Sequence, residues 1–446
     1  MGGTFTGSKI LPGTYVRYKS KKTTSPGSAV RGIAVVPLIG YDWGGASAAM
    51  VRIDSDSPDA NLAQIGRSVY ADDAVVRLIA LALENAETVY AYIPASTTKA
   101  TKTETFSTNN SLTVTAKYGG TRGNDITVSV VARTDSGFDV SVLVDGVEVE
   151  KFEKVANMTA IAALESEWVV FTGQGTLGAV ASMVLTGGTD VTPTASTWTD
   201  YLDALEGITF NTAAVPTDTA SVQSAAISKV NSMRDNAGKT VQFVMPNNAA
   251  NNVGIINVSN SFAYSDSDQL TVGQACAWVA GAEAGADKVT SNTYKVVPNA
   301  DRVVGALTVA GQEAAVKAGQ LFFITDDAGT VVVCYDINSL VSPSADQDLS
   351  YRKNRVIHTL DSFADDLRLN IKPNMFNNND EGWSLMEGIG RNLLMQYQAD
   401  NAIMNVNPEE DFFVDKTRTS GDECYFEVGI QPVDSAEKLY FTINTR

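Results

Sequence analysis

The chain contains a single histidine, and this limits the chemistry that its side chains can do. A Ser-His-Asp triad or a histidine-based metal site would have to use His358. This residue follows Val356 and Ile357, in a stretch whose apolar spacing predicts a helix with one buried face. We therefore interpret His358 as a partly buried or interfacial side chain, and we predict no catalytic residue.

A glycine pattern provides the second candidate site. Gly173, Gly175 and Gly178 have the GxGxxG spacing of a dinucleotide-binding loop, and they follow a predicted strand. Such a loop needs a helix that opens at the third glycine, so that its N-terminus faces the pyrophosphate. Only a short segment separates Gly178 from the double glycine Gly187–Gly188. We predict a glycine-rich turn and no cofactor.

Clustered carboxylates are the third candidate. Asp326–Asp327 and Asp365–Asp366 are adjacent pairs, and neighbours in a turn or a helix do not converge on one substrate. The carboxylates of both pairs are predicted to be exposed to solvent. Asp54, Asp56 and Asp59 lie in a Ser/Pro-containing loop that lacks the glycine and the terminal glutamate of an EF-hand. We predict no metal site.

Length and composition restrict the class of protein. A chain of 446 residues is expected to form about three domains. Its net charge of −18 argues against nucleic acid or an anionic membrane as a direct partner, because both attract positive surfaces. Three isolated cysteines, with no secretory signal and no apolar run long enough to span a bilayer, predict synthesis in the host cytoplasm and no membrane insertion.

The hydrophobic periodicity changes along the chain and predicts a multidomain α/β fold. A buried strand at 32–38, a helix at 72–86 and a strand at 88–93 have the order of a βαβ unit. Short alternating strands then follow, with a two-residue hairpin signal at Asp145–Gly146. After them we expect a strand at 208–211 and a hairpin around 326–329. Two helices and short strands come last, which predicts an α+β C-terminal unit. The expected domains are an arm and linker at 1–29, an α/β core formed by 30–94 and 191–343, an inserted β-rich domain at 95–190, the C-terminal unit at 344–435 and a strand arm at 436–446.

Both ends of the chain have the pattern of extended arms. Near the C-terminus, Leu439, Phe441 and Ile443 alternate with more polar residues, which is the period of a strand with one face to bury. No partner strand is nearby in the sequence. Arms of this kind must pair with an edge strand by β-augmentation, either in their own domain or in a neighbouring copy of the chain. The residues predicted to form the added strands are Thr14, Tyr15, Val16, Arg17, Tyr18, Leu439, Tyr440, Phe441, Thr442 and Ile443.

Several stretches resemble contractile phage tail sheath proteins, in the branch found in Gram-positive phages and phage-like bacteriocins. The similar stretches are residues 2–5, 11–16, 31–38 with Trp43-Gly44, and 433–441. The resemblance implies a structural subunit, not an enzyme, which polymerises as a helical tube around an inner tail tube. On contraction, such subunits move as rigid bodies while their exchanged arms hold the mesh together, and the tube is driven through a cell envelope.

The same resemblance implies an outer position for the inserted domain and partners beyond the chain itself. These partners are the inner tail tube protein and the baseplate and tail terminator proteins. Three alternatives remain open: another self-assembling tail or baseplate protein, an α/β enzyme, and a surface adhesin. The length argues against a tail tube protein, the single histidine against a hydrolase, and the lack of a signal peptide against an adhesin.

Overall fold

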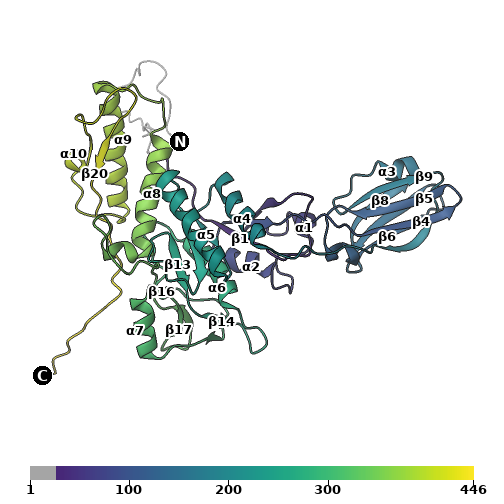
Figure 1. Ribbon diagram of the computed structural model, residues 1–446, viewed down its shortest axis with the longest axis horizontal. Coiled ribbons are helices and arrows are strands. Elements are labelled where there is room, and N and C mark those ends of the chain that lie inside the picture. Colours follow the sequence, from purple (N-terminus) through teal and green to yellow (C-terminus); the bar gives the residue numbers. More distant parts are fainter. Residues whose placement is uncertain (1–26, 446) are drawn as a thin grey trace, which may run out of the picture. The chain divides into compact units, whose positions relative to one another are not determined.

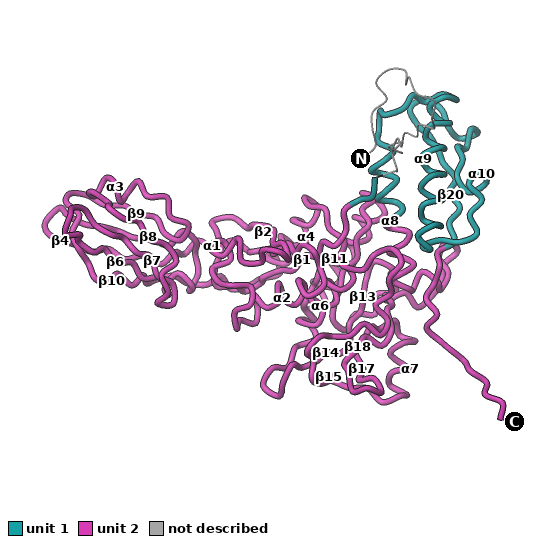
Figure 2. Tube along the Cα trace, turned by 180° about the vertical axis from the view of Figure 1, so that it is seen from behind, with its two compact units in different colours: residues 1–29, 363–431 teal, residues 30–362, 432–446 magenta. Residues whose placement is uncertain are grey.

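The computed structural model describes residues 27–445, so the predicted N-terminal strand residues Thr14–Tyr18 lie outside the described part. The chain divides into two compact units, coloured separately in Figure 2. The larger unit contains residues 30–362 and 432–446, and the smaller contains residues 363–431 with the N-terminal segment up to residue 29. Most of the chain therefore belongs to the larger unit.

A seven-stranded, mostly parallel sheet forms the centre of the larger unit (Figure 1). The strand order is β16-β13-β12-β11-β1-β3-β2, and only the edge strand β2 runs antiparallel, to β3. Such a sheet needs helical crossovers, which the alternating strand and helix pattern of the sequence supplies. The strands are β1 (Ile33–Pro37), β2 (Ala49–Asp54), β3 (Thr88–Ile93), β11 (Thr212–Ala214), β12 (Gln242–Pro246), β13 (Ile255–Val258) and β16 (Gln320–Leu321).

Helices cover both faces of this sheet. Along β1, Ala34 and Val36 join one hydrophobic cluster and Val35 joins the other, so the strand is buried on both sides. Helices α2 (Arg77–Leu83) and α6 (Val272–Gly285) contribute to the first cluster. Helices α4 (Ala195–Ala204) and α5 (Ala220–Asn231) contribute to the second.

Two predicted elements of the core are displaced in the structure. The strand expected at 208–211 is β11, which begins at Thr212, although the backbone of Asn211 already donates to Ile33 O at 2.9 Å and accepts from Gln242 N at 3.0 Å. The helix expected at 72–86 is shorter in the structure, where α2 contains only residues Arg77–Leu83. The Asp73 carboxylate accepts bonds from the backbone N–H groups of Val75 and Val76, each at 2.9 Å, which are the bonds of a helix N-cap, so the first helical turn follows Asp73.

Short elements complete the core. The predicted hairpin around 326–329 is confirmed as β17 (Phe323–Thr325) paired with β18 (Val331–Val333). A second antiparallel pair joins β14 (Ser261–Ala263) to β15 (Arg302–Val304). The remaining helices of the core are α1 (Leu62–Ile65), α7 (Val309–Lys317) and the single turns η2 (Leu205–Gly207), η3 (Ser232–Asn236) and η4 (Leu349–Arg352).

The β-rich segment forms a sandwich of two antiparallel sheets, of order β10-β6-β7-β8 and β4-β5-β9. The predicted hairpin joins β7 to β8, with positive φ at both Asp145 and Gly146, as a type I′ turn requires. Its elements are β4 (Thr101–Ser107), β5 (Asn110–Ala116), η1 (Thr121–Asp125), β6 (Ile126–Ala132), β7 (Phe138–Val144), β8 (Val147–Val155), α3 (Met158–Ala162), β9 (Val169–Gln174) and β10 (Val180–Val184).

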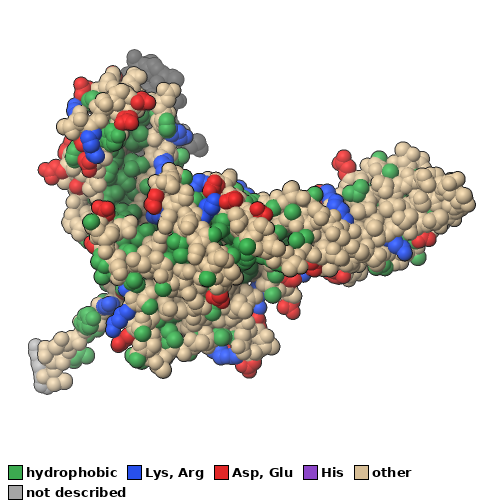
Figure 3. All heavy atoms as spheres, viewed as in Figure 1, with side chains coloured by type: hydrophobic (Ala, Val, Ile, Leu, Met, Phe, Trp, Pro, Cys, Tyr) green, Lys and Arg blue, Asp and Glu red, His purple; other side chains and the backbone are tan. Residues whose placement is uncertain are grey.

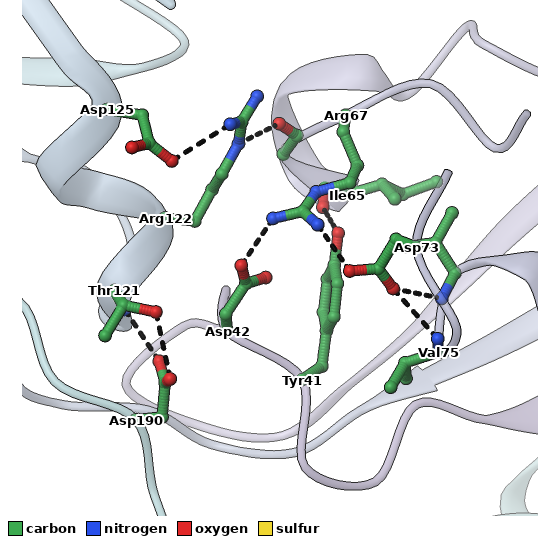
Figure 4. A network of polar contacts seen from close by, with 12 residues as sticks. Tyr41, Asp42, Ile65, Arg67, Asp73, Val75, Thr121, Arg122, Asp125 and Asp190 are labelled. Atoms are coloured by element: carbon green, nitrogen blue, oxygen red, sulfur yellow. Dashed lines mark hydrogen bonds and ion pairs between the residues drawn. The ribbon is translucent and has the colours of Figure 1, made fainter. Parts of the chain in front are cut away.

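Buried arginines join the sandwich to the core (Figure 4). The Arg122 side chain of the sandwich donates from Nε to the carbonyl of Gly66 at 2.9 Å and binds Asp145 through both terminal nitrogens. On the core side, Arg67 bridges Asp42 and Asp73. A Cβ on Gly120 would lie 1.9 Å from the carbonyl oxygen of Asp42, so the two backbones touch at this point. The junction is a close-packed interface.

The smaller unit is built on two helices and one short sheet. Its elements are the second half of α8 (Asn354–Asn370), α9 (Asp380–Ala399), α10 (Pro408–Asp411), β19 (Phe412–Val414) and β20 (Phe426–Val428). The rings of Phe363 and Tyr397 lie 5.2 Å apart, edge to face, and join the two long helices. The predicted multidomain α/β fold with an inserted β-rich domain and an α+β C-terminal unit is confirmed.

Asp366 corrects one prediction. We expected the Asp365–Asp366 pair to be solvated, but Asp366 is only 3% exposed. Its carboxylate accepts bonds from the Tyr397 hydroxyl and from Ala29 N, each at 2.6 Å. The helical phase turns Asp366 toward α9, where these two donors compensate for its burial.

Candidate assembly site

The C-terminal tail is the described segment that most clearly lacks a partner within the chain. Residues 438–445 form no strand with any described part of the chain, although their sequence has the period of one. Leu439, Tyr440, Phe441 and Ile443 are 66%, 90%, 82% and 87% exposed. Figure 1 shows the tail leaving the body of its unit, and Figure 3 shows hydrophobic side chains along it. Four large apolar side chains in a short exposed segment indicate an interaction site.

A sheet with one open edge lies in the smaller unit. Within the described residues, strands β19 and β20 pair with each other and with no other strand, in the register Phe412↔Val428 and Val414↔Phe426. The outer edge of β19 is covered by α9, because Val414 N donates to Oε1 of Glu387 at 2.9 Å and Phe412 O accepts from Nε of Arg391 at 3.1 Å, so the edge left without a partner is that of β20. Phe413 and Val428 are 39% and 38% exposed on this sheet. An isolated two-stranded sheet is marginal in water, and an added strand would complete it.

The glycine pattern forms a turn in the structure. Gly175 has a φ of +73°, and a Cβ there would lie 2.0 Å from Asn110 Oδ1. Strand β10 follows Gly178, where a dinucleotide site would need a helix. These glycines let β9 leave its sheet and β10 enter the other.

His358 is buried, 1% exposed, on α8. Its Nε2 atom lies 3.3 Å from Oε2 of Glu283, which is equally buried on α6. Burial lowers the pKa of His358 to about 4. Burial also raises the pKa of Glu283, and the nearby Asp336 carboxylate raises it further. The pair lies inside the unit, away from any surface where a substrate could bind.

The predicted acidic clusters each satisfy local bonds. Asp59 accepts from the Ser68 hydroxyl at 2.7 Å, and Asp54 accepts from the Thr88 hydroxyl at 2.7 Å. Asp326 caps the β17–β18 turn by accepting from Thr330 N. Within residues 27–445, no group of three or more His, Cys, Asp or Glu side chains is placed to hold a metal ion. No helix among these residues is both long and apolar enough to cross a membrane.

A surface hollow of about 360 Å³ contains several charged side chains of the core. Arg77 binds both carboxylate oxygens of Asp268. The Tyr264 hydroxyl and the Trp278 indole each donate to Glu84 at 2.8 Å. These groups satisfy one another and pin α2 against α6, so the hollow presents no converging unpaired groups to a ligand.

Comparisons with known proteins agree with the resemblance of the termini. The phage tail sheath protein beta-sandwich domain matches residues 95–190, the phage tail sheath protein central domain matches residues 192–339, and the phage tail sheath C-terminal domain matches residues 346–446. The phage-like element PBSX protein XkdK of Bacillus subtilis is 30% identical, over 99% of each chain.

Solved structures extend the comparison. The sheath tail protein from Desulfitobacterium hafniense is 35% identical, with a TM-score of 0.80, over 96% of this chain and 99% of that one. The helical sheath of the anti-feeding prophage in its contracted state shares the fold at 12% identity, with a TM-score of 0.57, over 98% of this chain and 100% of that one. Because the matched domains cover most of the chain and a relative at 30% identity covers nearly all of it, the chain belongs to the phage tail sheath family.

Proposed function

We propose that this contractile tail sheath subunit polymerises as a helical tube around an inner tail tube and that its terminal arms exchange strands between subunits. The observation that carries the proposal is the C-terminal tail, which has strand periodicity and exposed apolar side chains but no strand partner in the described chain. A head-to-tail exchange whose rotation does not close generates an open helix, as a sheath requires.

The open edge of β20 is the receiving site we propose for the tail of a neighbouring copy. A strand added there would pair with backbone groups of β20, and its apolar residues would lie near Val428. The N-terminal residues Thr14–Tyr18 are a second proposed strand. On contraction, the exchanged strands would stay paired while contacts between core domains change.

The further partners proposed are the inner tail tube protein and the baseplate and tail terminator proteins. The role proposed is structural and not catalytic. Its support is that the family and the similar solved structures are sheath proteins. The subunit would be made in the host cytoplasm and incorporated into a phage-like particle.

Electron microscopy of the purified protein tests strand exchange. Full-length protein at high concentration is expected to form hollow tubes, and a chain that lacks residues 438–446 is expected to stay monomeric. A full-length variant with Leu439→Ser, Phe441→Ser and Ile443→Ser should also fail, because it loses the apolar face of the strand.

The matched control changes the other face of the same segment, with Thr442→Ser and Asn444→Ser. This control should still form tubes, since it keeps the backbone and the apolar face. Normal tubes from the truncated chain would show that the tail is not needed for polymerisation and would reject the proposal.

A further inference from the structure

The tail begins at a buried glutamate. The Glu437 side chain is 9% exposed and forms an ion pair with Lys353, whose side chain is 13% exposed. The other carboxylate oxygen of Glu437 accepts bonds from the hydroxyls of Ser291, at 3.1 Å, and Thr293, at 2.7 Å. One side chain of the tail is therefore held by three groups of the α/β core.

Neighbouring contacts hold the same short stretch. Arg355 donates to the Ser435 hydroxyl at 2.8 Å, and Asp434 lies 3.6 Å from the Lys353 ammonium. The Lys353 ammonium also lies 4.5 Å from the centre of the Tyr335 ring. Residues 434–437 are thus attached at several points, which an incidental surface contact would not provide.

The groups that hold Glu437 are themselves fixed by the core. The Thr293 hydroxyl accepts from Asp336 N at 3.0 Å while it donates to Glu437. The Asp336 carboxylate accepts from Asn292 N at 2.8 Å and from Asn354 Nδ2 at 2.7 Å, and Asp336 is 1% exposed. Loop 291–293, the segment after β18 and the start of α8 therefore form one bonded network beneath the tail.

Exposure changes abruptly after this point. Glu437 is nearly buried, whereas Leu439 is 66% exposed and Tyr440 is 90% exposed. The structure separates a bound root, residues 434–437, from an exposed free segment, residues 438–445, whose first ammonium, on Lys438, still lies 6.0 Å from the centre of the Tyr335 ring. The two stretches therefore have different roles, and the boundary between them lies at Glu437, whose charged side chain is nearly buried.

We propose that Glu437 is a positioning residue that tethers the C-terminal arm to its own subunit, so that only residues 438–446 exchange into a neighbouring copy. This inference rests on the proposed strand exchange. A fixed root sets where the strand leaves the donor and limits its reach to about 30 Å for nine residues. A force on the exchanged strand is then transmitted to the hydrogen-bonded network of the core, and residues 432–437 stay attached to the donor subunit.

Hydrogen exchange on unassembled protein tests the tether separately from strand exchange. A chain ending at Glu437 keeps the whole root and lacks the free segment, whereas a chain ending at Ala436 also lacks the Glu437 side chain. We expect the first to protect amides in 288–295 and 432–437 as well as a full-length monomer does. The second, and full-length Glu437→Ala, should exchange there at least tenfold faster, because a buried Lys353 ammonium loses its partner.

Equal protection in all four proteins would reject the tether, whatever the tail does in assembly. Tubes formed by the chain ending at Glu437 would instead reject strand exchange, while the protection data would still report on the root. The two ideas can therefore fail independently.

An assembly readout distinguishes positioning from simple stability. Glu437→Ala should raise the protein concentration needed for tube formation severalfold, because an unpositioned strand loses more freedom on binding. Glu437→Gln keeps an acceptor for the two hydroxyls but loses the ion pair. The concentration it needs for tube formation should therefore lie between those of wild type and Glu437→Ala. Asp327→Ala, which removes an exposed carboxylate of the same unit that makes no contact with the tail, is the matched control and should behave as wild type. Identical behaviour of the Glu437 and Asp327 variants would reject a positioning role.

Discussion

At the scale of single residues, the chain places ionisable groups inside the core where no ligand reaches them. Glu283 and His358 lie side by side, and Asn292 Nδ2 donates to Glu283 at 2.9 Å. Burial raises the pKa of the Glu283 carboxyl and lowers the pKa of the His358 imidazole to about 4. Both shifts favour neutral side chains, so the pair packs in the interior without a net charge to compensate.

This pair predicts a specific pH dependence. A raised Glu283 pKa means that its contribution to stability is present below pH 4.5 and is lost as pH rises. The lowered His358 pKa acts oppositely, since that contribution is lost only as pH falls from 6.5 toward 4. Glu283→Gln cannot ionise, so its stability relative to wild type should rise as the pH increases above 4.5, by up to about 1.4 kcal/mol per pH unit.

Urea unfolding at three pH values measures this difference. Glu153→Gln, at an exposed position on β8, is the control. Its free energy of unfolding should change with pH in parallel with that of wild type. A curve for Glu283→Gln that also stays parallel to wild type would contradict a protonated Glu283 in the folded chain.

At the scale of elements, α9 supports the short sheet proposed to receive the arm. A Cβ on Gly390 would lie 2.2 Å from the ring of Phe412, the first residue of β19. The missing side chain lets this ring rest directly on the helix backbone. Gly388 lies two residues earlier on the same helix, and a Cβ there would meet no other segment of the described chain within 4 Å. Alanine at Gly388 therefore changes only the helix propensity, whereas alanine at Gly390 also changes the packing of Phe412 on the helix.

Alanine at each of these two positions tests whether Gly390 is needed for β19 to pack on α9. Gly390→Ala should destabilise the smaller unit by about 1–3 kcal/mol, because the methyl group displaces Phe412. It should also impair tube formation, since the receiving edge shifts. Gly388→Ala should stabilise by about 0.5–1 kcal/mol through helix propensity alone and leave assembly intact. Denaturant unfolding and electron microscopy measure both; unimpaired tubes from a destabilised Gly390→Ala would argue against β19–β20 as the receiving sheet.

At the scale of the whole molecule, a subunit with a net charge of −18 must associate with copies of itself. Like net charges oppose that encounter over long distances, while the proposed contacts are backbone pairing and apolar burial at short range. Such a balance keeps free subunits soluble until they meet a growing end. It also makes the rate of assembly sensitive to ionic strength.

Raising NaCl from about 0.01 M to about 0.15 M shortens the Debye length from about 30 Å to about 8 Å. Tube growth by the full-length protein, followed by light scattering, is therefore expected to accelerate. The chain lacking residues 438–446 should show no growth at either concentration. Slower growth in salt would indicate that complementary charged patches, and not short-range pairing, drive the encounter.

Local sequence determined much of this protein. The Asp145–Gly146 hairpin, the two long C-terminal helices and the alternation in the tail depend on neighbouring residues, and propensity and periodicity are local properties. The exact starts of β11 and α2 differ from the prediction, since backbone bonds to distant strands set the first and the Asp73 side-chain cap sets the second.

Only the tertiary structure decided which ionisable groups are buried and what they bind. Glu437 and Ser291 are 146 residues apart, and nothing near either one indicates the contact. The same holds for Glu283 with His358, and for Asp366, which was expected to be solvated and is bound by Tyr397. A charge is stable in an interior only where distant segments supply its partners, so the position of such a charge is known only once the segments have been brought together.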